Sequence, residues 1–207
     1  MQWGCGALPS CFYSVIAYPF LIYGRWVLSA ARGVPRGFQI LSSPFEASGI
    51  GFAMNIVLLE PEIPPNTGNV ARLCAATRTT LHLIEPLGFR LDDKQLKRAG
   101  MDYWEHVTWK RWKSWPEFIA GIPSEARLWF IESGGPRHYA EAEYQWEDYL
   151  VFGRETAGLP KSLLDANREQ WLRIPMFNAP ARSLNLSNCV ALVLFEALRQ
   201  QGFAGEV

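Results

Sequence analysis

The chain has 207 residues, of which 49% are hydrophobic, and this length and composition suit one globular domain with an ample core. Its 20 basic and 20 acidic residues balance, so no overall basic field indicates a nucleic-acid partner, although a local patch or a dimer can still gather positive charge. The four cysteines form no CxxC pair and have no histidine cluster. This pattern argues against a zinc site or a disulfide framework, and it favours reduced thiols in a cytoplasmic protein without a metal.

Residues 1–53 differ from the rest of the chain. They show no clear helical or strand period, and their only charged residues are Arg25, Arg32, Arg36 and Glu46. The apolar stretch 11–24 is short and is interrupted by Pro19, so we expect no membrane-spanning helix. No positive charge precedes this stretch, which disfavours a signal peptide, although residues 29–31 could mimic a cleavage site.

Met54 is the best candidate for the true start of the protein. A strand, a loop and a helix follow it at once in MNIVLLEPEIPPNTGNVARL. We therefore expect residues 1–53 to be an N-terminal extension outside the fold that arises from an over-long gene start. The alternatives are a disordered or loosely docked extension and, less favoured, an exported leader.

Residues 54–207 alternate short apolar runs with helical patterns. In chain order we expect a strand at 55–59, a helix at 66–77 with Asn66 or Thr67 near its cap, a strand at 81–84, and a short helix at 92–98. A helix at 115–120 then precedes strands at 128–131 and 149–152. A helix from about 160, a last strand at 171–174 and a final helix at about 185–200 complete the chain. Such alternation predicts an α/β fold with a mostly parallel sheet and helices on both faces.

Three segments after predicted strands carry polar residues, and ligands of open α/β sheets gather at the carboxyl ends of strands. The first, PEIPPNTGNVAR (61–72), offers helix amides to a ligand oxygen and places Arg72 one turn after Gly68. The second, FGRETAGLP (152–160), sets Glu155 between two glycines, where a buried carboxylate needs hydrogen-bond partners. The third, RSLNLSN (182–188), concentrates hydroxyls and amides before the final helix.

Each segment taken alone also fits a structural role: a capped helix start, a tight turn and the beginning of a core helix. Other site classes lack their motifs. No GxGxxG follows the first strand, no P-loop lysine motif is present and no GxSxG occurs. The three histidines are scattered and indicate no catalytic cluster.

In this order, NTGNVAR, FGRETAGLP and RSLNLSN resemble the three signature motifs of the SpoU branch of the SPOUT RNA methyltransferases. The resemblance covers residues 54–207 and none of 1–53. The opening NIVLLEPEIPPNTGNVARLCA, together with IEPLGF and KRAGMDYWE, is most similar to the minimal tRNA (cytidine(34)-2′-O)-methyltransferases. This family resemblance implies a C-terminal deep trefoil knot, which composition and periodicity do not indicate.

The resemblance also implies the site residues. Transferred by motif position, the pocket for S-adenosyl-L-methionine would include Ile131, Gly153, Ile174 and Ser183. Arg72 matches the family arginine that handles the ribose hydroxyl; because arginine is always charged, we expect it to orient the hydroxyl and not to act as the base. Asn66, Glu155 and Asn185 would shape the site.

The activity implied is methyl transfer from S-adenosylmethionine to the ribose 2′-hydroxyl of the wobble nucleotide 34 of tRNA, a cytidine or a modified uridine, in leucine tRNAs. The partners implied are the tRNA anticodon loop and a second copy of the chain, because the family builds its active site at a two-fold interface. Lys94, Lys97, Arg98, Lys110, Arg111 and Lys113 are candidate phosphate contacts. Two alternatives remain: methylation of ribosomal RNA, and a non-catalytic RNA-binding module with an inherited cofactor pocket.

Overall fold

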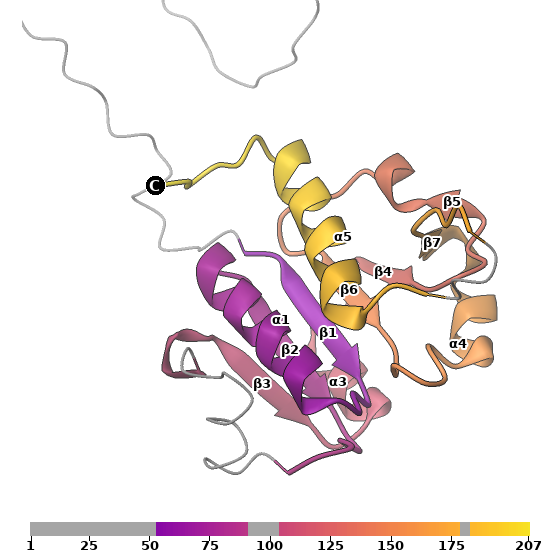
Figure 1. Cartoon of the computed structure of the whole chain (residues 1–207), viewed down its shortest axis with the longest axis horizontal. Coiled ribbons are helices and arrows are strands. Elements are labelled where there is room, and N and C mark those ends of the chain that lie inside the picture. Colours follow the sequence, from indigo (N-terminus) through magenta and orange to yellow (C-terminus); the bar gives the residue numbers. More distant parts are fainter. Residues whose placement is uncertain (1–52, 91–103, 179–182) are drawn as a thin grey trace, which may run out of the picture. The chain divides into compact units, whose positions relative to one another are not determined.

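A computed structural model describes residues 53–90, 104–178 and 183–207 of the chain (Figure 1). Seven strands form one sheet in the order β3-β2-β1-β6-β4-β7-β5, and every pairing between neighbours is parallel. The strands are β1 (Asn55–Leu59), β2 (Thr80–Ile84), β3 (Trp109–Trp112), β4 (Leu128–Ile131), β5 (Arg137–His138), β6 (Tyr149–Phe152) and β7 (Trp171–Arg173). The predicted α/β class with a parallel sheet is confirmed.

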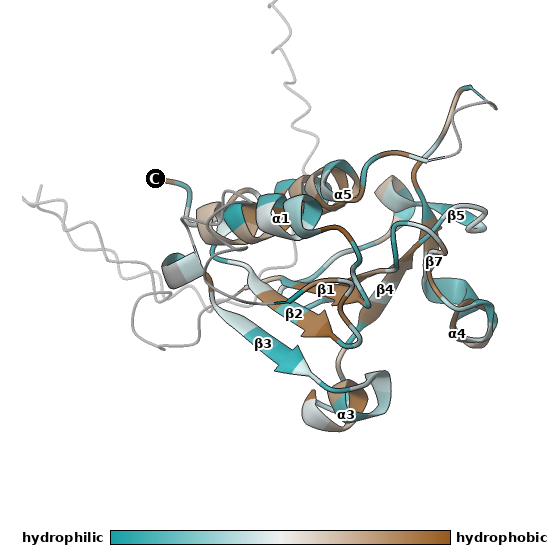
Figure 2. Ribbon diagram, turned by 60° about the horizontal axis from the view of Figure 1, so that its bottom comes forward, coloured by the Kyte–Doolittle hydropathy of each residue, from teal (hydrophilic) through white to brown (hydrophobic). Residues whose placement is uncertain are grey.

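Helices cover both faces of this sheet (Figure 2). The α-helices are α1 (Pro64–Thr77), α3 (Trp115–Gly121), α4 (Lys161–Ala166) and α5 (Leu186–Gln200). Short 3-10 turns occur at η1 (Trp104–His106), η2 (Tyr139–Glu141) and η3 (Arg168–Gln170). On one face α1 and α5 lie side by side over a core that includes Leu58, Leu150 and Val193; α3 packs Phe118 into a second core on the other face.

Central strands are buried on both faces, which explains why their sequences are apolar runs and not alternating patterns. The strands at 55–59, 128–131 and 149–152 have the predicted bounds. Strands β3 and β5 were not predicted, because β3 is the polar edge sequence WKRW and β5 has two residues. The predicted helix at 92–98 lies outside the described residues, as do residues 1–52 of the proposed extension 1–53.

The predicted start of the first helix was wrong. Helix α1 begins at Pro64, two residues before Asn66, and Ile63 is its N-cap. The first amides of a helix have no intrahelical partner, so proline, which lacks an N–H, is tolerated there. Pro64 and Pro65 are therefore the first two residues of α1 and do not precede it. Asn66 and Thr67 are therefore buried inside the first turn and do not cap it.

The topology brings four strand ends together. Strand β6 lies between β1 and β4, and β4 also pairs with β7. Because all four run in parallel, the loops that follow them emerge at the same edge of the sheet. In the ranges that the structure describes, no helix is long and apolar enough to cross a membrane.

Candidate active site

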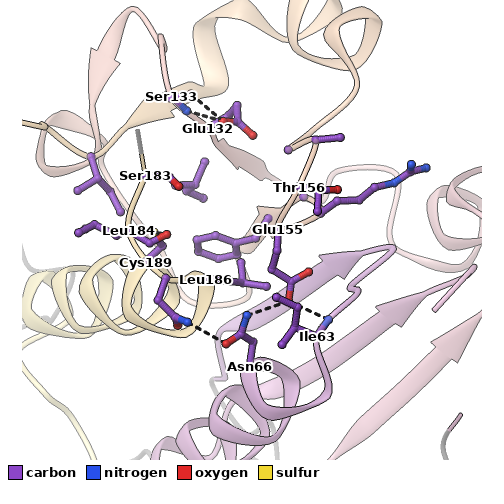
Figure 3. A pocket seen from close by; sticks show the side chains of 18 of the residues that line it. Ile63, Asn66, Glu132, Ser133, Glu155, Thr156, Ser183, Leu184, Leu186 and Cys189 are labelled. Carbon is purple, nitrogen blue, oxygen red and sulfur yellow. Dashed lines mark hydrogen bonds between the residues drawn. The ribbon is translucent and has the colours of Figure 1, made fainter. Parts of the chain in front are cut away.

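A cavity of about 500 Å³ opens at this edge, between the loops after β4, β6 and β7 and the start of α5 (Figure 3). Its walls contain the predicted cofactor residues Ile131, Gly153, Ile174 and Ser183, together with Asn66 and Glu155. Asn185 lines the cavity as well, so the structure brings seven of the eight predicted site residues to one place. Arg72 is the exception: it is exposed on α1 and does not line the cavity of this single chain.

The loop after β6 folds tightly enough to require glycine. A Cβ on Gly153 would stand 2.2 Å from the carbonyl carbon of Gly158, closer than any side chain can approach. Gly158 has a φ of +67°, and a Cβ there would stand 2.0 Å from a carboxylate oxygen of Glu132. The two glycines therefore let the backbone turn back on itself and form one wall of the cavity.

A chain of hydrogen bonds joins the three sequence motifs. The Asn185 amide donates to the Asn66 Oδ1 at 2.9 Å, and the Asn66 amide donates to the Glu155 Oε1 at 3.0 Å. Because a carboxylate only accepts, Asn66 must turn its NH₂ toward Glu155, which leaves its oxygen for Asn185. The hydrogen bonds therefore run in one direction, with donors pointing from the third motif to the first and from the first to the second.

Glu155 also holds the two residues that lead into α1. Its Oε2 accepts the Glu62 amide at 2.8 Å and its Oε1 accepts the Ile63 amide at 3.2 Å. A negative charge at this place also suits the positive end of the α1 dipole. The cost of burying Glu155 is thus offset by donors from a different loop.

Further contacts clamp the loop before α1 to the loop after β6. The Thr156 amide and hydroxyl both donate to the Glu62 Oε2, at 3.0 and 2.7 Å. Arg154 forms an ion pair with Glu60. These bonds have donors on both loops, so they hold segments 60–63 and 154–156 in a fixed position relative to each other.

Several cavity residues were not predicted, among them Glu132, Ser133, Met176 and Cys189. Glu132 directly follows β4, so the rule that ligands gather at carboxyl strand ends was a sufficient signal for it. Met176 and Cys189 were not recognised as cavity residues, because apolar side chains are usually part of the hydrophobic core. Burial, with a smaller contribution from Glu132, raises the pKa of the Cys189 thiol to about 11, so this thiol is neutral at physiological pH.

The lining suits an amphipathic organic ligand more than an ion. Ile131, Phe152, Ile174 and Leu186 supply apolar wall, and carboxylates, hydroxyls and amides supply the polar part. Small-molecule pockets of a few hundred Å³ typically combine apolar walls with few polar groups. Among the described residues, no group of three or more His, Cys, Asp or Glu is arranged to hold a metal ion.

Known proteins share this architecture. The sequence profile of the SpoU rRNA methylase family matches residues 53–195. The chain is 51% identical over 155 residues to the tRNA (cytidine(34)-2′-O)-methyltransferase of Escherichia coli strain K12, which covers 74% of this chain and 98% of the relative. A solved structure that concerns the 2-OH methylation of C/U34 on tRNA superposes with a TM-score of 0.69 at 44% identity, covering 73% of this chain and 98% of that one.

A more distant likeness is an AdoMet-bound rRNA methyltransferase from Sinorhizobium meliloti, with a TM-score of 0.63, 25% identity, and coverage of 71% of this chain and 56% of that one. The family profile spans the whole α/β unit up to α5 and includes all three motifs that meet at the cavity. The chain belongs to the SpoU rRNA methylase family, as its motifs predicted.

Proposed function

We propose that this chain transfers a methyl group from S-adenosylmethionine to the ribose 2′-hydroxyl of the wobble nucleotide 34 of tRNA, a cytidine or a modified uridine, with leucine tRNAs as substrates. The observation that carries the proposal is the cavity at which Asn66, Glu155 and Asn185 from three distant segments are hydrogen-bonded into one unit. Identity of about half over nearly the whole length of the Escherichia coli wobble methyltransferase supports the choice of nucleotide.

The residues present fit the methyl donor. Apolar walls at Ile131, Phe152 and Ile174 suit an adenine ring, and the carboxylates of Glu132 and Glu155 suit a cationic ligand. When bound, the donor supplies a methyl group on a sulfonium, which is a good leaving group. In the proposed reaction the ribose oxygen would attack the methyl carbon in line, the carbon–sulfur bond would break with its electron pair remaining on sulfur, and the hydroxyl proton would pass to water.

Catalysis of this kind depends on alignment. The clamp between residues 60–63 and 154–156 and the capped start of α5 hold the cavity walls in one geometry. Fixing two reactants in a near-attack arrangement contributes on the order of 7–11 kcal/mol to such reactions. We also propose the C-terminal knot that the family resemblance implies. The strand order supports it, because β7 lies between β4 and β5 and not at an edge of the sheet.

The anticodon loop is the substrate that a chain of this size can reach. Bases in single-stranded loops splay outward and leave the 2′-hydroxyl accessible, and affinity for them rests largely on phosphate contacts. We therefore expect binding to weaken as salt rises. A ribose deep in folded ribosomal RNA would demand a larger recognition surface.

We also propose that the enzyme is a homodimer. Leu192 and Phe195 are 43% and 49% exposed one turn apart on α5, a spacing that places them on one face of the helix. A second copy packed on this face would bury them. Sedimentation at micromolar concentration should give a dimer for the wild type and a monomer for Phe195→Glu; a fully active wild-type monomer would contradict the proposal.

The assay for the function uses purified protein, labelled methyl donor and leucine-accepting tRNA transcripts. One transcript carries a ribonucleotide at position 34 and its matched control carries a 2′-deoxynucleotide there. We expect label only in the first. Equal labelling of both transcripts, or labelling of ribosomal RNA fragments alone, would show that the wobble assignment is wrong.

A further inference from the structure

Glu132 places a second carboxylate in the cavity, across from Glu155. It directly follows β4, and Figure 3 shows it at the opposite end of the cavity from Asn66 and Glu155. Its backbone is fixed by β7, because the Glu132 amide donates to the Leu172 carbonyl at 3.0 Å. The side chain is held by neutral donors: Leu159 N–H bonds to Oε2 at 3.0 Å, and the amide and hydroxyl of Ser133 bond to Oε1 at 2.8 and 2.9 Å.

None of these partners cancels the charge of Glu132. Among the residues that the structure describes, the charged residues of the cavity lining are Glu132, Arg154 and Glu155. Arg154 is engaged by Glu60, which does not line the cavity, and Glu155 is held by amides. The described part of the lining is therefore negative on balance, and the field of Glu132 also contributes, after burial, to the raised pKa of Cys189.

The charge of the proposed ligand changes during the reaction. The methyl donor carries a sulfonium cation, and loss of the methyl group leaves a neutral thioether. A fixed negative charge in the cavity therefore stabilises the ligand before transfer more than after it. This difference requires no contact between Glu132 and the sulfur, since charge–charge interactions act over several ångströms.

We propose that Glu132 makes the cavity prefer the cationic methyl donor over its neutral product, and so promotes exchange of product for fresh donor. The inference deepens the proposed function and rests on S-adenosylmethionine being the ligand. Two unit charges about 8 Å apart at an effective dielectric constant of about 20 correspond to roughly a 30-fold change in affinity. Solvent and salt in an open cavity reduce this value, so we expect an effect between about threefold and 30-fold.

The test is calorimetric titration of wild type and Glu132→Gln with S-adenosylmethionine, S-adenosylhomocysteine and sinefungin, an analogue that carries an ammonium group in place of the methylsulfonium. Gln preserves the volume of the side chain and removes its charge. We expect Glu132→Gln to weaken the binding of the two cationic ligands by at least about threefold, and the binding of the neutral product by less than about 1.5-fold. Glu132→Asp, which retains the charge, should keep most of the preference, and Glu125→Gln, on an exposed carboxylate outside the cavity, should change nothing.

Equal weakening of all three ligands would show that Glu132 only holds the loops in place, and unchanged affinities would show that its charge has no role; either result overturns the inference and leaves the proposed function standing. A wild-type chain that binds neither donor nor product overturns both. Thermal melting of each variant identifies loss of fold. If Glu132→Gln does not fold, titration of the wild type at low and high salt replaces it: salt should weaken the two cationic ligands more than the neutral product, and equal weakening would overturn the inference.

Discussion

Arg72 is the predicted catalytic residue that lies apart from the cavity. It is exposed on α1, six residues beyond Asn66, which is roughly 9 Å farther along the helix axis. We predict that Arg72→Ala leaves donor affinity nearly unchanged and lowers methyl transfer by about tenfold or more, or roughly 1.4 kcal/mol of transition-state stabilisation. Calorimetry and single-turnover methylation measure the two effects. Arg168→Ala, at another exposed arginine, is the control, and an equal loss of donor binding would place Arg72 in the donor pocket.

His82 is a buried histidine with a structural role. Its Nδ1 accepts the Trp112 indole N–H at 3.1 Å, and its Nε2 lies 3.2 Å from the Asn55 Oδ1. Because an indole N–H only donates, His82 must be neutral with its proton on Nε2. Burial, with a smaller contribution from Lys110, lowers the pKa of His82 from 6.5 to about 4.

This shift predicts acid sensitivity. The folded pKa lies below the unfolded pKa, so the unfolded chain takes up a proton first as pH falls. His82 therefore has no effect above about pH 6.5, and it lowers the free energy of unfolding progressively from pH 6.5 to 4, by up to roughly 3 kcal/mol. Urea unfolding at several pH values should show a shallower acid slope for His82→Gln than for the wild type. Identical slopes would mean that other groups cause the loss.

At the scale of elements, the start of α5 combines two roles in Asn185. Its Oδ1 caps the helix by accepting the Ser187 amide at 2.9 Å, while its NH₂ donates to Asn66. Asp is an equally good N-cap but cannot donate. We predict that Asn185→Asp keeps the melting temperature close to that of the wild type and lowers methyl transfer about tenfold or more. Asn185→Ala should lose the same activity and also about 1 kcal/mol of stability. Full activity in Asn185→Asp would show that the bond to Asn66 is dispensable.

At the scale of the whole molecule, the prediction concerns residues 1–53. Met54 is 1% exposed and belongs to the core, and its carbonyl accepts the Thr80 amide, so the fold includes it. We predict that a chain beginning at Met54 is soluble, melts cooperatively and methylates RNA. A chain beginning at Val57 behind an added initiator Met is the matched control and should not fold, because it lacks the first half of β1. Loss of soluble protein in the Met54 chain would contradict the over-long-start hypothesis.

Patterns with a local physical cause were predictable from the sequence. Strands β1, β4 and β6 are continuous apolar runs because they are central in a parallel sheet, and their alternation with helices determines the α/β class. The edge strand β3 was not predictable in this way, because a strand that faces solvent needs no apolar run. The start of α1 was predicted two residues too late, although proline at the first helical position is a local signal. The hydrogen bond from the Ile63 amide to Glu155 was not predictable, because Glu155 lies 92 residues away from Ile63 in the sequence.

The sequence by itself determined the class of the fold, the family and the segments that carry polar residues, because motif order and apolar periodicity are local properties of the chain. Only the tertiary structure decided how those segments meet. It oriented Asn66 between Asn185 and Glu155, joined Glu155 to the residues that lead into α1, and set Glu132 in the cavity as a carboxylate held by amides and a hydroxyl. These roles depend on which strand ends lie next to one another at one edge of the sheet. The strand ends become neighbours only in the folded sheet, where β6 lies between β1 and β4 and β7 lies between β4 and β5.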